Sequence, residues 1–297
     1  MKVDERRSTV RIGPAGWSYK DWIGPVYPPG RKVDELLMIT RYFDCVELNS
    51  SFYRTPPQHL VRSWAERTSQ RPGFLFTVKV LQRFTHERLG NAGEAQRFIH
   101  TFDPLIERGR LGAFLLQFPW SFRDTPENRA LLSALGPWFR DFRAAVELRH
   151  GSWQSPDAAR HLTACGFAFC NIDQPVIGDS MPPTELVTDP RLAYIRLHGR
   201  NRSDWFRTDA GRDERYNYLY REEEMTEWAQ RAERLAAKVD HLFIVTNNHF
   251  RGQALVNAFQ LRSLMTHEKQ VMPERLVAAY PVLRTIAHEP PAQGALL

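Results

Sequence analysis

Eight short apolar segments recur along the chain, separated by stretches of helical or loop character. The segments are rich in Val, Ile, Leu and Phe and have the length of single strands, which is typical of parallel strands covered on both faces. The expected strands are residues 10–16, 45–49, 74–79, 113–118, 144–149, 167–172, 193–198 and 242–247. Eight alternating β and α units predict a single (β/α)8 TIM-like barrel, and a doubly wound open sheet is the alternative.

Several segments between the strands have the 3.6-residue period of amphipathic helices. The clearest is residues 222–239, where Met225, Trp228 and Leu235 share one stripe. The other expected helices are residues 33–43, 57–68, 92–108, 126–135 and 252–267, with a kink at Pro104 and a C-terminal cap at Gly109. No GxGxxG or phosphate-binding loop follows an expected strand, which argues against the open sheet.

The length of 297 residues suits one barrel domain over residues 10–289, with an N-terminal extension at 1–9 and a flexible tail at 290–297. The long loops at 175–190 and 201–221 are expected on the carboxyl face of the barrel. The apolar runs are too short for a membrane helix, which needs about 18 residues. We therefore expect no membrane partner. Because Cys45, Cys165 and Cys170 form an odd set without CxxC spacing, we expect them to be reduced core residues of a cytoplasmic protein.

Charged and amide side chains stand at the carboxyl ends of most expected strands. A charge inside a buried parallel strand is costly unless it is paired or functional. Residues two apart in a strand share a face, so the members of each strand-end pair point the same way. The residues concerned are Glu47 with Asn49, Glu147 with Arg149, and Arg196 with His198, together with Lys79 and Gln117. We expect them to converge at the mouth of the barrel.

These residue types indicate acid–base chemistry on an anionic ligand. Two neighbouring glutamates can act as a general acid and base, and His and Lys can move protons or stabilise negative charge. The catalytic candidates are therefore Glu47, Glu147, Lys79 and His198. Arginines clamp phosphate or carboxylate groups, and aromatic rings stack on flat ligands. The binding candidates are Trp17, Asn49, Tyr53, Gln117, Arg149, Arg196 and Asn248.

Two alternatives remain open for the same residues. The charges could form a salt-bridge network that only fills the barrel mouth. A single Mg²⁺ or Mn²⁺ could bind Glu47, Glu147 or Asp173, although neither HxH nor HExxH spacing occurs and we predict no metal site. No particular cofactor is indicated.

The motifs at the strand ends resemble those of the YecE-like family, the domain of unknown function number seventy-two. The resemblance covers about residues 10 to 267. It rests on Gly16-Trp17-Ser18-Tyr19, Val46-Glu47-Leu48-Asn49-Ser50-Ser51-Phe52-Tyr53, Phe76-Thr77-Val78-Lys79, Leu116-Gln117-Phe118-Pro119, Val146-Glu147-Leu148-Arg149-His150, Tyr194-Ile195-Arg196-Leu197-His198-Gly199 and Asn247-Asn248-His249. It implies a TIM-like barrel similar to the xylose-isomerase-like group that includes endonuclease IV, and a nucleic-acid or phosphate-bearing ligand. This chain lacks the His-rich ligand set of the trinuclear-zinc nucleases.

The leading hypothesis is an enzyme acting on a phosphate- or carboxylate-bearing ligand, either a small molecule or nucleic acid, with phosphodiester hydrolysis or isomerisation as the reaction. A non-catalytic nucleic-acid-binding protein is the first alternative. It predicts a basic stripe leading outward from the mouth, built from Arg54, Arg83, Arg88, Arg200, Arg202 and Arg207. A sugar or sugar-phosphate isomerase is the second alternative and would need a divalent ion.

Overall fold

The computed structural model describes residues 8–203, 205 and 212–288. The expected tail at 290–297 lies outside the described residues. Of the expected extension at 1–9, only residues 8 and 9 are described, and Thr9 already belongs to the first strand. Part of the long loop at 201–221 also lies outside the described residues.

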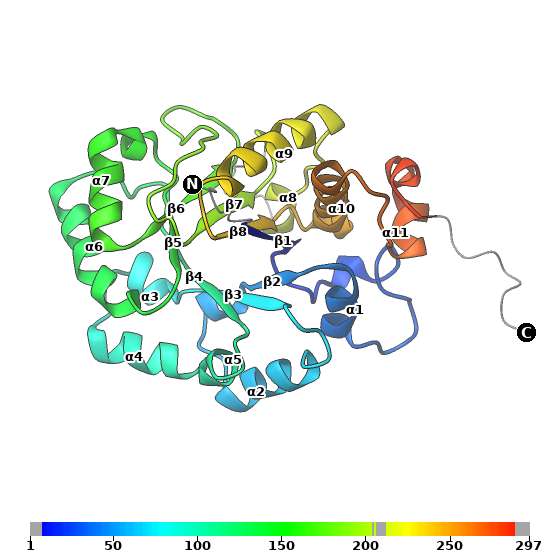
Figure 1. Cartoon of the computed structure of the whole chain (residues 1–297), viewed down its shortest axis with the longest axis horizontal. Coiled ribbons are helices and arrows are strands. Elements are labelled where there is room, and N and C mark those ends of the chain that lie inside the picture. Colours follow the sequence, from blue (N-terminus) through cyan, green and yellow to red (C-terminus); the bar gives the residue numbers. More distant parts are fainter. Residues whose placement is uncertain (1–7, 204, 206–211, 289–297) are drawn as a thin grey trace, which may run out of the picture.

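Eight parallel strands form the barrel that the sequence predicts (Figure 1). Neighbouring strands follow the order β1-β8-β7-β6-β5-β4-β3-β2. Each strand lies within two residues of its expected position at either end, because buried apolar runs mark strand interiors well and strand ends poorly. The strands are β1 (Thr9–Pro14), β2 (Cys45–Leu48), β3 (Leu75–Lys79), β4 (Leu111–Gln117), β5 (Ala144–Glu147), β6 (Ala168–Asp173), β7 (Ala193–Leu197) and β8 (His241–Thr246).

The barrel closes between β1 and β2 through a backbone hydrogen bond from Asp44 to the Ile12 carbonyl at 3.3 Å and through a bridge at their carboxyl ends. There the backbone N–H of Gly16 donates to the carbonyl of Glu47 at 2.9 Å, and Ala15 pairs with Glu47. Further down the seam Gly13 faces Cys45 so closely that a Cβ on residue 13 would lie 1.8 Å from the Cys45 carbonyl oxygen. The absence of a side chain at Gly13 therefore lets the first two strands meet.

Helices surround the barrel, and the amphipathic segments form most of them as expected. The structure divides the expected helix at 92–108 into α4 and α5 just before Pro104, and Gly109 after it has a φ of +62°. The helices of the described residues are α1 (Glu35–Tyr42), α2 (Gln58–Arg67), α3 (Gln82–Thr85), α4 (Ala92–His100), α5 (Asp103–Ile106), α6 (Pro126–Phe139), α7 (Pro156–Cys165), α8 (Arg212–Arg215), α9 (Glu222–Ala236), α10 (Gln253–Thr266) and α11 (Glu274–Ala279). None of the described helices is long and apolar enough to span a bilayer.

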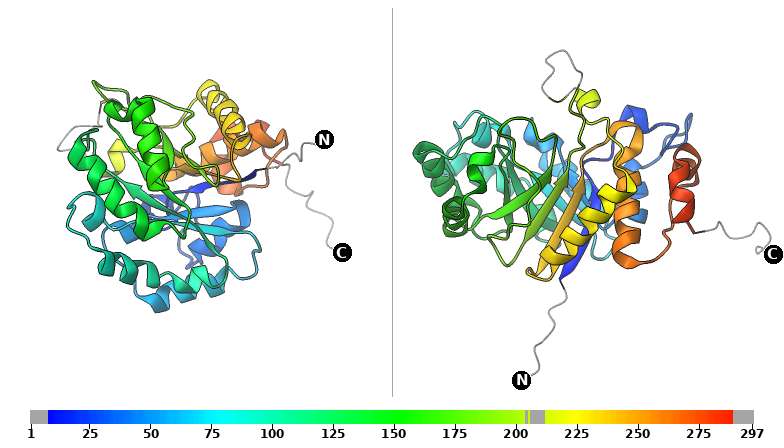
Figure 2. Two further views of the ribbon diagram at one scale, coloured as in Figure 1. Left: turned by 60° about the vertical axis from the view of Figure 1, so that its left-hand side comes forward. Right: turned by 90° about the horizontal axis from the view of Figure 1, so that it is seen from above.

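One helix that the apolar pattern did not predict is α7. Local signals at its ends specify it, because the Ser155 side chain accepts from the Ala158 N–H and Gly166 ends it in the left-handed region. Figure 2 shows that the start of β1 and the short helix α8, which follows β7 in the chain, lie at opposite ends of the barrel. The loops that follow the strands therefore gather at one end, away from the start of the chain.

Candidate active site

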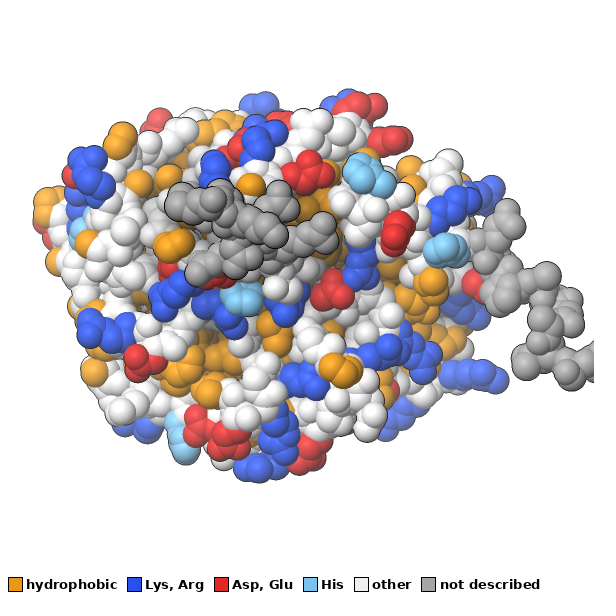
Figure 3. Space-filling model, in the orientation of Figure 1, with side chains coloured by type: hydrophobic (Ala, Val, Ile, Leu, Met, Phe, Trp, Pro, Cys, Tyr) orange, Lys and Arg blue, Asp and Glu red, His pale blue; other side chains and the backbone are white. Residues whose placement is uncertain are grey.

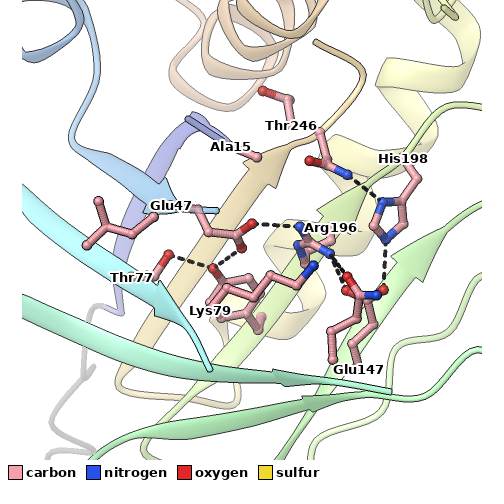
Figure 4. A network of polar contacts seen from close by, with 12 residues as sticks. Ala15, Glu47, Thr77, Lys79, Glu147, Arg196, His198 and Thr246 are labelled. Atoms are coloured by element: carbon pink, nitrogen blue, oxygen red, sulfur yellow. Dashed lines mark hydrogen bonds and ion pairs between the residues drawn. The ribbon is translucent and has the colours of Figure 1, made fainter. Parts of the chain in front are cut away.

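Arg196, near the end of β7, occupies the centre of the polar cluster at the carboxyl end of the barrel (Figure 4). Its side chain is only 1% exposed. Nη2 donates to Oε1 of Glu47 at 2.6 Å, and Nη1 donates to Oε2 of Glu147 and to Oε1 of Gln117, the latter at 3.3 Å. One guanidinium thus connects β2, β4, β5 and β7.

Glu147 is surrounded by donors. Its Oε1 accepts from Nε of Arg149 at 2.7 Å and from Nε2 of His198 at 3.1 Å, while Oε2 accepts from Arg196. Complete burial opposes ionisation, but the charges of Arg196 and Arg149 and the contact with His198 outweigh it and hold the pKa of Glu147 well below its usual range. Glu147 is therefore a permanent carboxylate at physiological pH.

The other glutamate, Glu47, is equally enclosed. Its Oε2 accepts from the hydroxyl of Tyr194 at 2.8 Å, and Oγ1 of Thr77 lies 2.7 Å from that hydroxyl. Its Oε1 is occupied by Arg196. Both carboxylates thus use both of their oxygens within the barrel, which suits groups that hold Arg196 in place.

His198 is held as a neutral ring. Its Nε2 donates to Glu147, and its Nδ1 accepts from the side-chain amide of Asn247 at 2.9 Å. Burial lowers the pKa of His198 to about 3 despite the neighbouring carboxylate. Because both ring nitrogens are engaged, this placement favours a positioning role for His198 over proton transfer to a ligand.

Lys79, at the end of β3, differs from the other charged residues of the cluster. Its side chain is buried, and Nζ lies 3.9 Å from the centre of the Phe52 ring. Within the part of the chain that the structure describes, Nζ makes no hydrogen bond and no ion pair. Burial, followed by the positive charge of Arg196, lowers the pKa of Lys79 to about 7. The amine is therefore poised to gain or lose a proton near neutral pH.

A small pocket of about 90 Å³ opens above Lys79. Five predicted site residues line it: Asn49, Tyr53, Lys79, Gln117 and Arg196. Four other residues complete the lining and were not among the predicted site residues, namely Tyr19, Tyr216, Asn247 and His249. The rings of Tyr19 and His249 stack at 4.4 Å, and Tyr216 lies 5.2 Å from His249. The sequence signal that could have identified these four residues is their position, either shortly after an expected strand or in the long loop after β7.

Three predicted binding residues do not line the pocket, namely Trp17, Arg149 and Asn248. Arg149 donates instead to Glu147. The ring of Trp17 packs edge-to-face against Trp64 and Phe76, at 5.6 and 6.5 Å between centres. Asn248 donates to the Tyr218 carbonyl and to Oδ1 of Asn257 on α10. Adjacent residues of an extended chain point in opposite directions, so Asn247 rather than Asn248 faces the pocket.

The carboxylates considered as Mg²⁺ or Mn²⁺ ligands are already engaged by protein donors. Asp173 accepts from Nε of Arg200 at 3.0 Å and from the Trp228 indole at 2.7 Å, and both glutamates are saturated as described. Among residues 8–203, 205 and 212–288, no group of three or more His, Cys, Asp or Glu side chains could hold a metal ion. The donor set as arranged does not fit a resident divalent cation.

Basic side chains are not confined to this end of the barrel. Figure 3 views the opposite, amino-terminal face, where Lys and Arg side chains are spread around the centre and the rim. Here burial and the charges of Arg11 and Arg191 lower the pKa of Arg143. The net charge of +6 therefore does not indicate where a ligand binds. The pairing of individual charges does distinguish the pocket from the rest of the surface.

Comparisons with known proteins agree with the fold. The family model described as "Protein of unknown function DUF72" matches residues 11–281. The UPF0759 protein YunF of Bacillus subtilis (strain 168) is 30% identical over 274 residues, which are 87% of this chain and 95% of the relative. A solved DUF72 family protein from Thermotoga maritima MSB8 is 32% identical with a TM-score of 0.78 and covers 87% of this chain and 99% of its own. Another, from Enterococcus faecalis V583, is 27% identical with a TM-score of 0.76 over 87% and 96%.

Proposed function

The chain belongs to the family of proteins of unknown function DUF72, and we propose that it is an enzyme acting on a small compound that carries a carboxylate or phosphate group. The compound binds in the pocket above Lys79, and Lys79 acts as the general acid or base that transfers a proton to or from this compound. The observation that carries this proposal is the buried amine of Lys79, which lines a pocket and makes no ion pair or hydrogen bond with any described residue.

The balance of charges around the pocket favours an anionic ligand. When Lys79 is protonated, it supplies three cations together with Arg149 and Arg196, whereas Glu47 and Glu147 supply two carboxylates and His198 is neutral. The site therefore carries one positive charge in excess in a buried environment, where an unpaired charge costs several kcal/mol. An anion in the pocket would remove that cost, and this gain is the source of its affinity.

Each remaining residue has a distinct task in this proposal. The saturated glutamates fix the guanidinium of Arg196, which lines the pocket and presents positive charge to the ligand. The side-chain amides of Asn49, Gln117 and Asn247 provide neutral donors and acceptors around it. Lys79 lines the pocket and changes its charge near neutral pH, so it is suited to general acid–base catalysis.

The pocket favours a small molecule over a polynucleotide. A volume of about 90 Å³ has room for roughly six to nine heavy atoms, since each water-sized atom takes about 10–15 Å³ of it. Two arginines expected to extend a nucleic-acid stripe are neutralised locally, since Arg83 pairs with Glu94 at 3.0 Å and Arg200 pairs with Asp173 at 3.0 Å. Arg207 lies outside the described residues.

Anion binding can be tested with inorganic phosphate and with malonate, using the melting temperature and isothermal titration calorimetry. We expect one of these anions to stabilise the protein saturably, since a ligand that binds only the folded state raises its stability. Lys79→Met should abolish the effect, and Lys238→Met, which removes an exposed lysine beyond α9, should retain it. Equal stabilisation of both variants, or none of the unmodified protein, would contradict the proposal.

A further inference from the structure

Lys79 stands apart from the other lysines of the chain. The sequence contains only six, at positions 2, 20, 32, 79, 238 and 269. Lys20, Lys32, Lys238 and Lys269 are exposed, and Lys2 lies outside the described residues. Among the described lysines, Lys79 alone is buried, and it alone ends a barrel strand and lines the strand-end pocket.

The surroundings of Nζ leave its lone pair available. The two nearby carboxylates, Glu47 and Glu147, are used by Arg196, Arg149, His198 and Tyr194 and form no ion pair with Lys79. On one side Nζ faces the apolar ring of Phe52. A lysine amine that is desolvated and lies beside other cations is the kind that reacts as a nucleophile.

We propose that Lys79 is a carbonyl-reactive amine and that the substrate class of this pocket is an anionic aldehyde or ketone, such as an α-keto acid, bound to Nζ as a Schiff base. The inference rests on the proposed function, because it requires that an anion enters the pocket. It adds the identity of the electrophile and gives Lys79 a covalent role.

The chemistry of this step balances without any further reactant. The lone pair of neutral Nζ attacks the carbonyl carbon, and a C–N bond forms as the C–O π bond breaks. Two protons pass from nitrogen to the former carbonyl oxygen, which leaves as water, so that amine plus carbonyl gives imine plus water. The iminium that forms on protonation keeps the positive charge at Nζ, and the carboxylate next to it in an α-keto acid supplies the counter-charge that the pocket lacks.

The pocket also supplies groups for the proton transfers. Tyr19, Tyr53, Tyr216 and His249 line it together with Lys79. Hydroxyl and imidazole groups can pass a proton to the departing oxygen, directly or through water. The amide of Asn49 can hold the carbonyl oxygen during the attack, and the guanidinium of Arg196 can hold the carboxylate.

Reductive trapping tests the inference directly. The protein is incubated with pyruvate and sodium cyanoborohydride at pH 7, which reduces an imine to a stable secondary amine, and the modified residue is located by peptide mass spectrometry. We expect one adduct per chain, on Lys79, formed at least tenfold faster than on any other lysine. Lactate, which has no carbonyl group, should give no adduct.

Two matched variants and a competitor complete the test. Lys79→Arg keeps the charge and should lose the adduct, whereas Lys238→Arg should retain it. Labelling that is spread over the exposed lysines, or labelling that is unchanged in Lys79→Arg, would overturn the inference. Mapping the labelled sites of the unmodified protein gives this answer even if Lys79→Arg does not fold.

Malonate should protect Lys79 from labelling. If malonate binds at Lys79 but pyruvate does not label it, the covalent role fails and the proposed function stands; if pyruvate labels Lys79 and no anion competes, the proposed function fails.

Discussion

Arg196 on β7 donates from Nη2 to Oε1 of Glu47 on β2 at 2.6 Å, across the interior of the barrel. The two strands are not neighbours in the sheet, so this contact joins parts of the barrel that no backbone hydrogen bond connects. The same guanidinium also binds Glu147 on β5. The pair therefore fixes the geometry of the site and determines which cation is left without a partner.

Replacing Arg196 should destabilise the protein strongly. Arg196→Met leaves the buried carboxylates of Glu47 and Glu147 without their shared counter-charge, and such a change costs about 3–5 kcal/mol. Urea denaturation measures the free energy of unfolding. The control is Arg234→Met, which breaks the more exposed contact with Glu185 and should cost no more than about 1 kcal/mol. Equal losses in both variants would show that the central network contributes nothing special.

Replacing Lys79 should have the opposite effect on stability. Lys79→Met removes an ammonium that must be buried without a partner and should raise the free energy of unfolding by about 1–3 kcal/mol at or below pH 7. The pKa of Lys79 is about 7 in the native protein and has its ordinary value of 10.5 in the unfolded chain. Between these pH values the unfolded chain therefore holds a proton that the native protein has lost. The gain should therefore shrink as the pH rises from 7 toward 10.5, and denaturation at pH 6 and pH 9 tests this. A variant that is less stable than the unmodified protein at pH 6 would contradict the assignment.

The neutral state of His198 predicts a loss of stability in acid. Its pKa is lowered from 6.5 to about 3, so between these values the unfolded chain binds a proton that the native protein does not. The free energy of unfolding should fall as the pH falls through this window, by up to about 1.4 kcal/mol per pH unit from this histidine. His198→Gln should reduce that slope relative to the unmodified protein. An unchanged slope in His198→Gln would argue against a neutral His198.

The seam between β1 and β2 depends on Gly13. Gly13→Ala places a Cβ 1.8 Å from the Cys45 carbonyl oxygen, so the strands must separate. We expect a loss of at least about 3 kcal/mol or failure to fold, measured by thermal and urea denaturation. Gly93→Ala in α4 is the matched control, because its nearest contacts would be at 3.5 Å and alanine favours the helix. A Gly13→Ala protein as stable as the control would show that the seam is wider than described.

The barrel and the convergence of its strand-end charges could be predicted from the sequence. Short apolar runs predicted the strands. The two-residue period correctly placed Glu147 with Arg149, and Arg196 with His198, on shared faces, since Arg149, Arg196 and His198 all contact Glu147. Closure of eight parallel strands then brings such residues together. The family and fold indicated by the strand-end motifs are confirmed by the comparisons.

The pairing within the site could not be predicted, because it depends on rotamers and packing. Nothing in the spacing indicates that Arg196 takes both glutamates and leaves Lys79 alone. The direction of Trp17 toward Trp64 likewise follows from the packing of α2 against the barrel, which a local pattern does not encode. Asn247 and Asn248 are adjacent residues that follow β8 and point in opposite directions. Which of the two faces the pocket depends on where the strand ends, and the sequence does not mark that end.

The proposed chemistry depends on the charge state of Lys79, which a side-chain NMR titration of the lysines measures. The groups that set this charge are Arg196, Glu147, Glu47 and Arg149, and the neighbouring His86 has its own pKa lowered to about 4 by burial and then by Lys79. We expect one lysine resonance, missing in Lys79→Arg, to titrate with a midpoint at about 7 and to shift upward when malonate is added. If every lysine resonance titrates above about pH 9, or the Lys79 midpoint ignores malonate, the account is contradicted.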